Sequence, residues 1–301
     1  SPPKPPPTMT TLFLSVFGRL KLINLQFVFI EKGEQMIKEE SQLSERTDNF
    51  IMLPTVDFCF KELMQNEKVR TGILSALMGK EPEEFKETIL LPTILRKQYL
   101  NEKYGVLDVR VLLKDGTQTD LEMQVAQFDF WPNRVLFYLG KMYTDQIKEG
   151  ESYDKLKKCV HVSILDFLHF PMDDRCYRKI SFCDVETGEV YTDLMEIYVL
   201  ELGKLPPEDK NESGIVRWMR FLGGKCREDF AKMAEKDPYI KEAYKVLENI
   251  SADDEKRIEY EAREKALKDY NTQMLSAERR GEKRIILNMH RLGKTVEEIL
   301  G

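Results

Sequence analysis

A pair of acidic residues on two adjoining segments of alternating sequence is the strongest candidate for chemistry in this chain. Asp108 lies in residues 106–113, whose odd positions are all aliphatic, and Glu122 lies in residues 119–125, whose odd positions 121, 123 and 125 are apolar. Side chains of a β-strand alternate between two faces, so both acids point away from the apolar face. Two carboxylates that meet on a sheet repel each other unless a cation joins them, and oxygen ligands select a hard ion such as Mg²⁺ or Mn²⁺. Such an ion polarises a phosphodiester and lowers the pKa of an attacking water.

The register of a hairpin decides whether these acids meet. Residues 114–117 (KDGT) are a strong turn signal between the two segments. Directly opposed residues share a face, so their numbers must have an even sum if both apolar faces meet one core. A plain two-residue turn gives an odd sum, so we expect a three- or five-residue loop, or a bulge. Asp108 then lies opposite Glu122 or Gln124, and the three side chains converge. The alternative is a polar, solvent-facing sheet surface with incidental acids.

Helices and further strands must position this hairpin. Apolar spacing predicts a helix over residues 55–78 that is broken near Asn66, with Thr55 as its cap and Gly79 as its stop. The other expected elements are strands at 88–99, 104–114 and 118–126, a helix at 132–149, a buried strand at 159–167, and a strand pair at 177–185 and 189–201.

Composition divides the chain into three parts. Residues 1–35 are expected to be an extension outside the functional fold, residues 36–205 the domain that carries the acids, and residues 206–301 a charged helical region. Helix breaks are expected near 223–224 and 237–238, and a capping cluster at 251–254 opens a helix to about residue 280. The thin apolar stripe of that helix fits a coiled-coil seam or a solvated helix packed on one side.

Several protein classes are disfavoured by the composition. A formal net charge of -6 argues against a protein that coats nucleic acid non-specifically, although an enzyme with a local basic groove remains compatible. The five cysteines are odd in number and form no C-x-x-C pair, so we expect reduced, mostly buried thiols in a cytoplasmic protein. The three histidines form no metal or triad pattern. We find no apolar stretch typical of a membrane span and no glycine-rich phosphate loop, so neither a membrane nor a nucleotide cofactor is expected.

The order of the expected elements resembles the PD-(D/E)XK nuclease core. That core is an α/β fold of order αβββαβ, with a mixed central sheet flanked by helices, and here a C-terminal helical extension would follow it. Local segments resemble the Rpn family of recombination-promoting nucleases and putative transposases over about residues 50–205. They are residues 57–63 (DFCFKEL), 107–109 (LDV), 121–124 (LEMQ), Arg134 with Tyr138, Tyr143 and Gln146, and 150–153 (GESY).

The resemblance implies a bacterial, Mg²⁺-dependent DNA endonuclease linked to recombination or mobile elements. Asp108 and Glu122 would hold the metal, and Gln124 would stand where the wider superfamily has a lysine. A neutral amide offers only hydrogen bonds where an ammonium group offsets phosphate charge, so another cation is expected to help.

Five further residues are candidates for supporting roles. Lys61, Arg110 and Arg134 could supply the missing positive charge, or could be surface charges. Asp57 could reach the metal or stabilise the start of its helix. Tyr138 shares a helix side with Arg134, where it could support Glu122, touch DNA or pack in the core.

A second class of function is a protein that keeps the nuclease fold without its catalysis. Such a module would bind DNA or protein, and the C-terminal helices could join two copies into a homodimer. A transposase of the RNase H type fits less well, because its acids lie on several strands and a distant helix, whereas the best pair here lies on one hairpin.

Overall fold

The structure is a computed structural model that describes residues 50–95, 105–127, 129–209 and 211–292. The extension expected at residues 1–35 lies outside this range. Residues Ile51–Gly301 form one compact unit. In the described part of the chain, no helix is long and apolar enough to cross a lipid bilayer.

A mixed sheet of six strands lies at the centre of this unit, in the order β1-β4-β5-β6-β8-β7. Its strands are β1 (Ile89–Leu91), β4 (Val109–Leu112), β5 (Gln118–Gln124), β6 (Cys159–Leu165), β7 (Tyr177–Cys183) and β8 (Val190–Glu201). Strands β5, β6 and β8 run parallel, and the other pairs are antiparallel. A short second sheet pairs β2 (Ile94–Leu95) with β3 (Gly105–Val106). Parallel neighbours need a crossover, which α4 (Trp131–Thr144) provides between β5 and β6.

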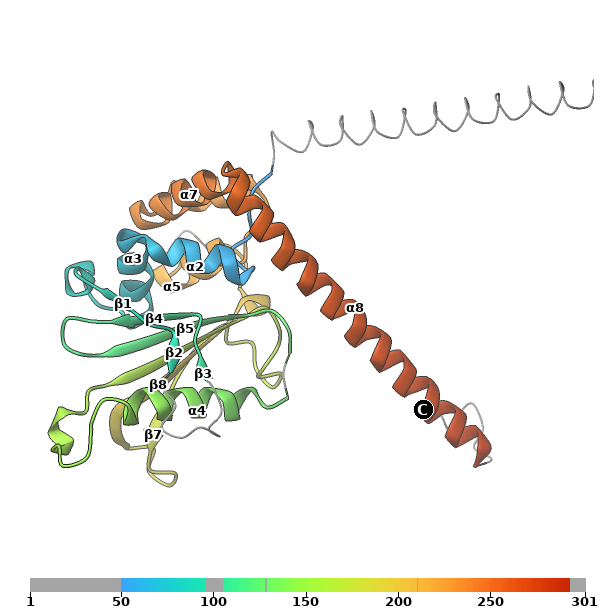
Figure 1. Ribbon diagram of the computed structural model, residues 1–301, viewed down its shortest axis with the longest axis horizontal. Helices are drawn as coiled ribbons and strands as arrows, with labels where there is room; N and C mark the ends of the chain where they lie inside the picture. The colour runs from blue at the N-terminus through green and yellow to red at the C-terminus, as the bar shows by residue number, and fades with distance from the viewer. Residues whose placement is uncertain (1–49, 96–104, 128, 210, 293–301) are drawn as a thin grey trace, which may run out of the picture. The chain divides into compact units, whose positions relative to one another are not determined.

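Helices cover both faces of the sheet (Figure 1). Helix α4 packs on one face. The helices on the side of the other face are α2 (Asp57–Gln65), α3 (Glu67–Met78), α5 (Gly214–Leu222) and α7 (Pro238–Ser251). Helices α6 (Arg227–Ala234) and α8 (Asp254–Arg291) complete the fold, with short 3-10 turns at Pro82–Phe85, Tyr153–Lys155 and Leu202–Lys204. The αβββαβ order and the flanking helices are as predicted.

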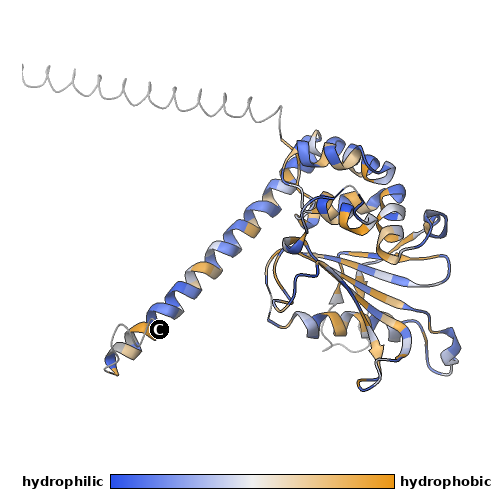
Figure 2. Ribbon diagram, turned by 180° about the vertical axis from the view of Figure 1, so that it is seen from behind, coloured by the Kyte–Doolittle hydropathy of each residue, from blue (hydrophilic) through white to orange (hydrophobic). Residues whose placement is uncertain are grey.

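The core reflects this layered arrangement. All seven residues of β6 are buried, because the strand has helices on both sides. Figure 2 shows hydrophobic residues, in orange, along the central strands, whereas α8 is mostly hydrophilic. The aromatic rings of Trp218, Phe221 and Phe230 contact one another between α5 and α6. The composition change after residue 206 therefore corresponds to helices that pack within the same unit as the sheet.

The predicted break in the first helix is confirmed. Asn66 separates α2 from α3, and its side chain accepts a hydrogen bond from the Val69 N–H at the start of α3. Gly79 ends α3 in the left-handed conformation, with φ of 63°. The cap predicted at Thr55 is wrong, because Val56 occupies the capping position of α2 and no side chain caps that end.

The two strands predicted at 88–99 and 104–114 are each interrupted. Pro92 lacks an N–H group and separates β1 from β2. The chain bends at Asp108 and separates β3 from β4, because the Asp108 N–H bonds to a side chain and not to the strand ladder. Residues 96–104 of these two predictions lie outside the described residues.

The predicted hairpin register is confirmed. Val109 lies opposite Leu121 and Val111 lies opposite Thr119, so the sums are even. The loop has three residues between Leu113 and Thr117, whose backbones are bonded, and Gly116 adopts φ of 88° there. The apolar odd face is buried as expected, but Asp120 and Glu122 at the centre of the even face are buried as well, on the side of the sheet that α4 covers. The acids therefore do not lie on a solvent-facing sheet.

Three smaller expectations are corrected. Helix α4 ends at Thr144 and not near residue 149, because the Gln146 side chain bonds to the Lys157 backbone and draws the chain into a loop. Helix α8 continues past residue 280 to Arg291, since a glycine at position 281 costs a helix only about 1 kcal/mol. All five cysteines are free as expected, but only Cys59 and Cys159 are buried.

Candidate active site

Two hydrogen bonds between the bend at Asp108 and strand β5 bring Asp108 and Glu122 together. The Asp108 N–H donates to Glu122 Oε1 at 3.2 Å, and the Met123 N–H donates to Asp108 Oδ2 at 3.2 Å. The bend at Asp108 makes this possible, because it leaves the Asp108 N–H outside the strand ladder. The two acids predicted to meet are therefore locked to each other through the backbone.

Each of these carboxylates also contacts a cation from a different helix. Lys61 Nζ of α2 lies 2.9 Å from Asp108 Oδ1, and Arg134 Nη2 of α4 lies 3.2 Å from Glu122 Oε2. Glu122 is 1% exposed, whereas Lys61 and Arg134 are 38% and 35% exposed. The site is therefore open to solvent on its cationic sides and closed beneath Glu122.

Two aromatic rings of α4 hold Arg134. Its guanidinium carbon lies 5.4 Å from the ring centroid of Trp131 and 5.1 Å from that of Tyr138. The three residues occupy positions i, i+3 and i+7, which lie on one side of a helix. A planar guanidinium group stacks on aromatic rings while its edge donates hydrogen bonds, so this arrangement presents Arg134 to Glu122.

A buried polar chain runs beneath Glu122. His161 Nδ1 lies 2.8 Å from Asp120 Oδ2, and His161 Nε2 lies 3.0 Å from Ser163 Oγ. Ser163 also accepts a hydrogen bond from Trp131 Nε1 at 3.2 Å, which connects the chain to the ring under Arg134. This network was not predicted from the sequence. Its signal was the alternation of His161 and Ser163 on β6, directly beside Asp120 and Glu122 of β5.

Burial shifts the ionisation of this cluster. Desolvation, followed by the charges of Asp120 and Asp108, raises the pKa of Glu122 to about 8. Burial also raises the pKa of Asp120 well above its usual range and lowers the pKa of His161 to about 4. The pKa of Lys61 is raised despite its burial, because Asp108 and Asp57 favour its charge. The interior of the site therefore disfavours further negative charge.

The donor set fits a hard divalent cation. Asp108 and Glu122 contact Lys61 and Arg134, and the buried Asp120 beside them contacts His161, so the three carboxyl groups outnumber the two cations that contact them. No group of three His, Cys, Asp or Glu residues suited to a metal occurs among the described residues. Mg²⁺ commonly binds one or two carboxylates and keeps several waters, so the pair does not need a third acid.

The other candidate residues lie around this pair. Gln124 follows Glu122 on the same face of β5, and its Nε2 donates to the Ala126 carbonyl at 3.0 Å. Arg110 Nη2 donates to Gln118 Oε1 at 2.6 Å, and within the described part of the chain it forms no hydrogen bond or ion pair with Asp108 or Glu122. Of the three cations considered from the sequence, Lys61 and Arg134 thus reach the acids and Arg110 does not.

Asp57 belongs to the margin of the site. Its Oδ2 lies 3.3 Å from Lys61 Nζ, so the lysine contacts both Asp57 and Asp108. Arg263 of α8 approaches the same oxygen at 3.7 Å. Asp57 and Gln124 line one cavity of about 280 Å³ together with Arg263 and Tyr270. The start of α8 therefore forms part of the wall beside the acid pair.

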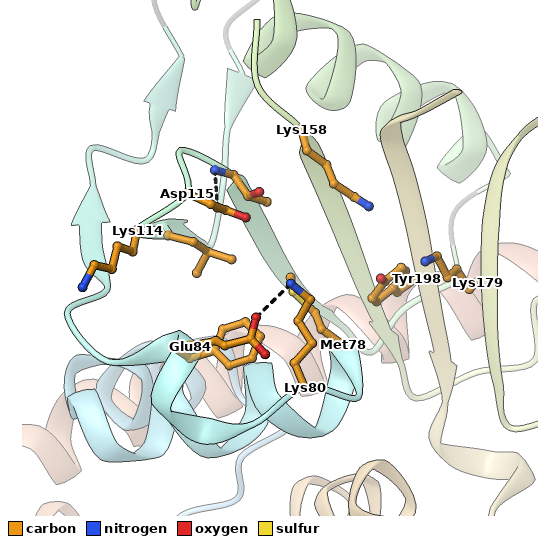
Figure 3. A pocket seen from close by; sticks show the side chains of 11 residues that line it. Met78, Lys80, Glu84, Lys114, Asp115, Lys158, Lys179 and Tyr198 are labelled. Atoms are coloured by element: carbon orange, nitrogen blue, oxygen red, sulfur yellow. Dashed lines mark hydrogen bonds and ion pairs between the residues drawn. The ribbon is translucent and has the colours of Figure 1, made fainter. Parts of the chain in front are cut away.

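Another cavity, of about 370 Å³, lies at the other end of β5, near the hairpin turn (Figure 3). Lysines surround it, but Lys158 and Lys179 both contact the buried Glu196, at 2.9 and 2.8 Å. Lys80 pairs with Glu84 across the cavity wall. These cations already have internal partners, so this cavity is not the candidate active site.

Comparison with known proteins agrees with this geometry. The family model of the PD-(D/E)XK nuclease family transposases matches residues 54–277. The chain belongs to this family. The match extends from the start of α2 into α8 and contains every residue of the site described above. No curated protein and no solved structure gives a significant match to the chain.

Membership confirms the predicted superfamily and supports a nuclease or transposase-like role. PD-(D/E)XK nucleases generally use divalent metal ions, which agrees with the oxygen donors found here. In the described part of this chain, a lysine from α2 contacts the first acid, while the strand position two residues after Glu122 holds Gln124.

Proposed function

We propose that the protein is a metal-dependent DNA endonuclease that hydrolyses phosphodiester bonds. The observation that carries the proposal is the backbone-locked pair of Asp108 and Glu122, with a cation from a separate helix on each carboxylate. Asp108 and Glu122 would hold Mg²⁺ or Mn²⁺, which when bound would supply Lewis-acid activation of the phosphodiester and of water. Gln124 would add an amide hydrogen bond near this point.

The residues of the chain have separate tasks in this proposal. Lys61 supplies the positive charge that Gln124 lacks, and its contact with Asp57 keeps it directed at the acid pair. Arg134 stabilises charge on a phosphate oxygen, and Tyr138 keeps its guanidinium group in place. Arg110 has a peripheral position and would act at most on the DNA backbone.

The test is cleavage of supercoiled plasmid with Mg²⁺, Mn²⁺ or EDTA by the wild-type protein and by Asp108→Ala and Glu122→Gln. We expect metal-dependent nicking that both substitutions abolish. The matched control is Glu196→Gln, which removes another buried carboxylate of the same sheet far from the acid pair, and should leave cleavage unchanged when folded. Equal cleavage by all variants would show that the activity comes from a contaminant.

A catalytically weak or inactive binding module is the second candidate. It is favoured by the full occupation of the central carboxylates, because Lys61 and Arg134 already bond to Asp108 and Glu122. In that case the protein would bind DNA or a partner protein without cutting DNA. A gel-shift assay with uncut DNA separates the candidates, since binding without metal-dependent cleavage supports the module.

The biological setting is part of the same proposal. The transposase description of the family supports a role in mobile elements. We propose in addition a role in recombination and a bacterial cytoplasmic location. The later turns of α8 expose apolar residues such as Tyr270, Met274 and Ile285, which would suit a homodimer through the C-terminal helices. Light scattering at several concentrations tests the dimer, and a monomer at all concentrations would refute it.

A further inference from the structure

The position of Arg134 restricts access to Glu122. Oε1 of Glu122 accepts the Asp108 N–H, and Oε2 is the oxygen that Arg134 Nη2 contacts at 3.2 Å. The Glu122 side chain is almost fully buried, whereas Arg134 is about one third exposed. A metal ion that binds Oε2 would therefore meet the guanidinium group, and two cations on one oxygen repel each other.

Arg134 has a second means of attachment that does not depend on Glu122. The rings of Trp131 and Tyr138 both lie within cation–π distance of its guanidinium carbon. Trp131 is itself fixed by its hydrogen bond to Ser163. If the contact with Glu122 breaks, the guanidinium group still has two aromatic faces that keep it beside the site.

Arg134 also has unused hydrogen-bonding capacity. Its Nε is buried and has no hydrogen-bond partner among the described residues. A guanidinium group has five N–H donors in a planar fork that matches a phosphate group. The buried Nε is not accessible to an anion, but release from Glu122 would leave Nη2, on a side chain that is about one third exposed, free to donate to one.

We infer that Arg134 is an exchangeable partner of Glu122: it contacts Oε2 in the metal-free protein, would leave that oxygen when a divalent ion is bound, and would then contact the phosphate of the substrate while Trp131 and Tyr138 retain it. This inference rests on the proposed function, because it assumes a divalent ion at Glu122. Arg134 thus competes with the metal in the free protein and acts with it on the substrate.

The first experiment measures Mg²⁺ binding to the full chain by isothermal titration calorimetry. Arg134→Gln should bind Mg²⁺ more tightly than the wild type by about ten-fold or more, as expected from the loss of a close competing charge. Its cleavage of DNA should nevertheless fall. Arg110→Gln is the matched control, because it removes one positive charge from the neighbouring strand β4, where Arg110 bonds to Gln118, and its affinity should stay within about two-fold of the wild type.

The second experiment uses the fluorescence of Trp131 to report the position of the Arg134 guanidinium group, which lies over its ring. The chain has two tryptophans, so Trp218→Phe leaves Trp131 as the sole emitter. Mg²⁺ should shift the emission of this variant with the same midpoint as the calorimetric titration, because the cation over the ring moves. The shift should disappear when Arg134→Gln is added.

The outcomes separate this inference from the proposed function. Mg²⁺ binding of equal or lower affinity in Arg134→Gln, or binding without a change in Trp131 emission, overturns the inference and leaves the nuclease proposal intact. Absence of Mg²⁺ binding in both the wild type and Arg134→Gln overturns the inference and also removes Mg²⁺ from the proposed function. Tighter binding in Arg134→Gln together with the emission shift supports both.

Discussion

Replacement of Glu122 by glutamine should stabilise the metal-free protein at alkaline pH, although it removes a residue of the candidate site. Glu122 is 1% exposed, and burial together with two neighbouring acids raises its pKa to about 8. Glutamine has nearly the shape of the protonated side chain and can still accept the Asp108 N–H. The variant therefore keeps the neutral form that the folded protein prefers.

The direction of the effect follows from proton binding. With a raised pKa, Glu122 holds its proton in the folded protein at pH values where the unfolded chain has released it, so stability falls as pH rises from about 4.5 to about 8. At about 1.4 kcal/mol for each pH unit, this loss amounts to at most about 5 kcal/mol in the free energy of unfolding. Below pH 4.5 the wild type and Glu122→Gln should be about equally stable.

The assay is urea unfolding in EDTA at intervals from pH 5 to 9. The free energy of unfolding of Glu122→Gln should exceed that of the wild type by an amount that grows with pH, and Mg²⁺ should raise the stability of the wild type alone. Glu196→Gln is the matched control. Despite its burial, Glu196 has a lowered pKa because it bonds to Lys179, Lys158 and Tyr198.

The control should change stability in the opposite direction. The stabilising effect of Glu196 is present above about pH 4.5 and is lost as pH falls through its lowered pKa, so Glu196→Gln should destabilise the protein at pH 8. A constant difference between Glu122→Gln and the wild type across the pH range would refute the argument from burial. The same conclusion would follow if both variants were destabilised at pH 8.

Two further predictions concern a cation of the site and the packing of α3. Lys61→Met should lower the rate of metal-dependent cleavage by about 10²-fold in a plasmid assay, because it removes the cation that contacts Asp108. Its control is Lys68→Met, which replaces an exposed lysine of α3 and should leave the cleavage rate unchanged. Gly72→Ala should destabilise the protein by about 1–3 kcal/mol in urea unfolding, because the added Cβ would lie 2.3 Å from an atom of Tyr239. Gly140→Ala on α4 is the control, since its Cβ would meet nothing within 4 Å, and a stability equal to that of Gly72→Ala would contradict the packing argument.

The hairpin could be predicted from the sequence because one rule determined it. The apolar odd positions of both strands had to meet the same core, which required a three- or five-residue loop and brought Asp108 and Glu122 together. The break at Asn66 was predictable for a similar local reason, since asparagine caps the helix that follows it. Both features depend on residues that are close in sequence.

The partners of the acids could not be predicted in the same way. Polar residues at alternate positions of a strand usually indicate a solvent-exposed face, so Asp120 gave no sign of its complete burial; the buried strand predicted at 159–167 contains His161, but its contact with Asp120 was not predicted. Their burial depends on α4, whose packing position is set by long-range contacts. The sequence identified Lys61, Arg110 and Arg134 as possible cations, but only the fold distinguishes the two that reach the acids from the one that does not.

The acids of the site are fixed within the sheet and their cations come from helices, and this arrangement has a consequence for how mutations act. Asp108 and Glu122 are fixed by backbone hydrogen bonds within the sheet, whereas their cations come from α2 and α4. A mutation that alters a cation therefore leaves the geometry of the acid pair intact, and a lineage can relocate positive charge among helices without rebuilding the strands. Gln124 at the end of β5 donates to the Ala126 carbonyl, so its replacement would leave the two hydrogen bonds that fix the acids intact.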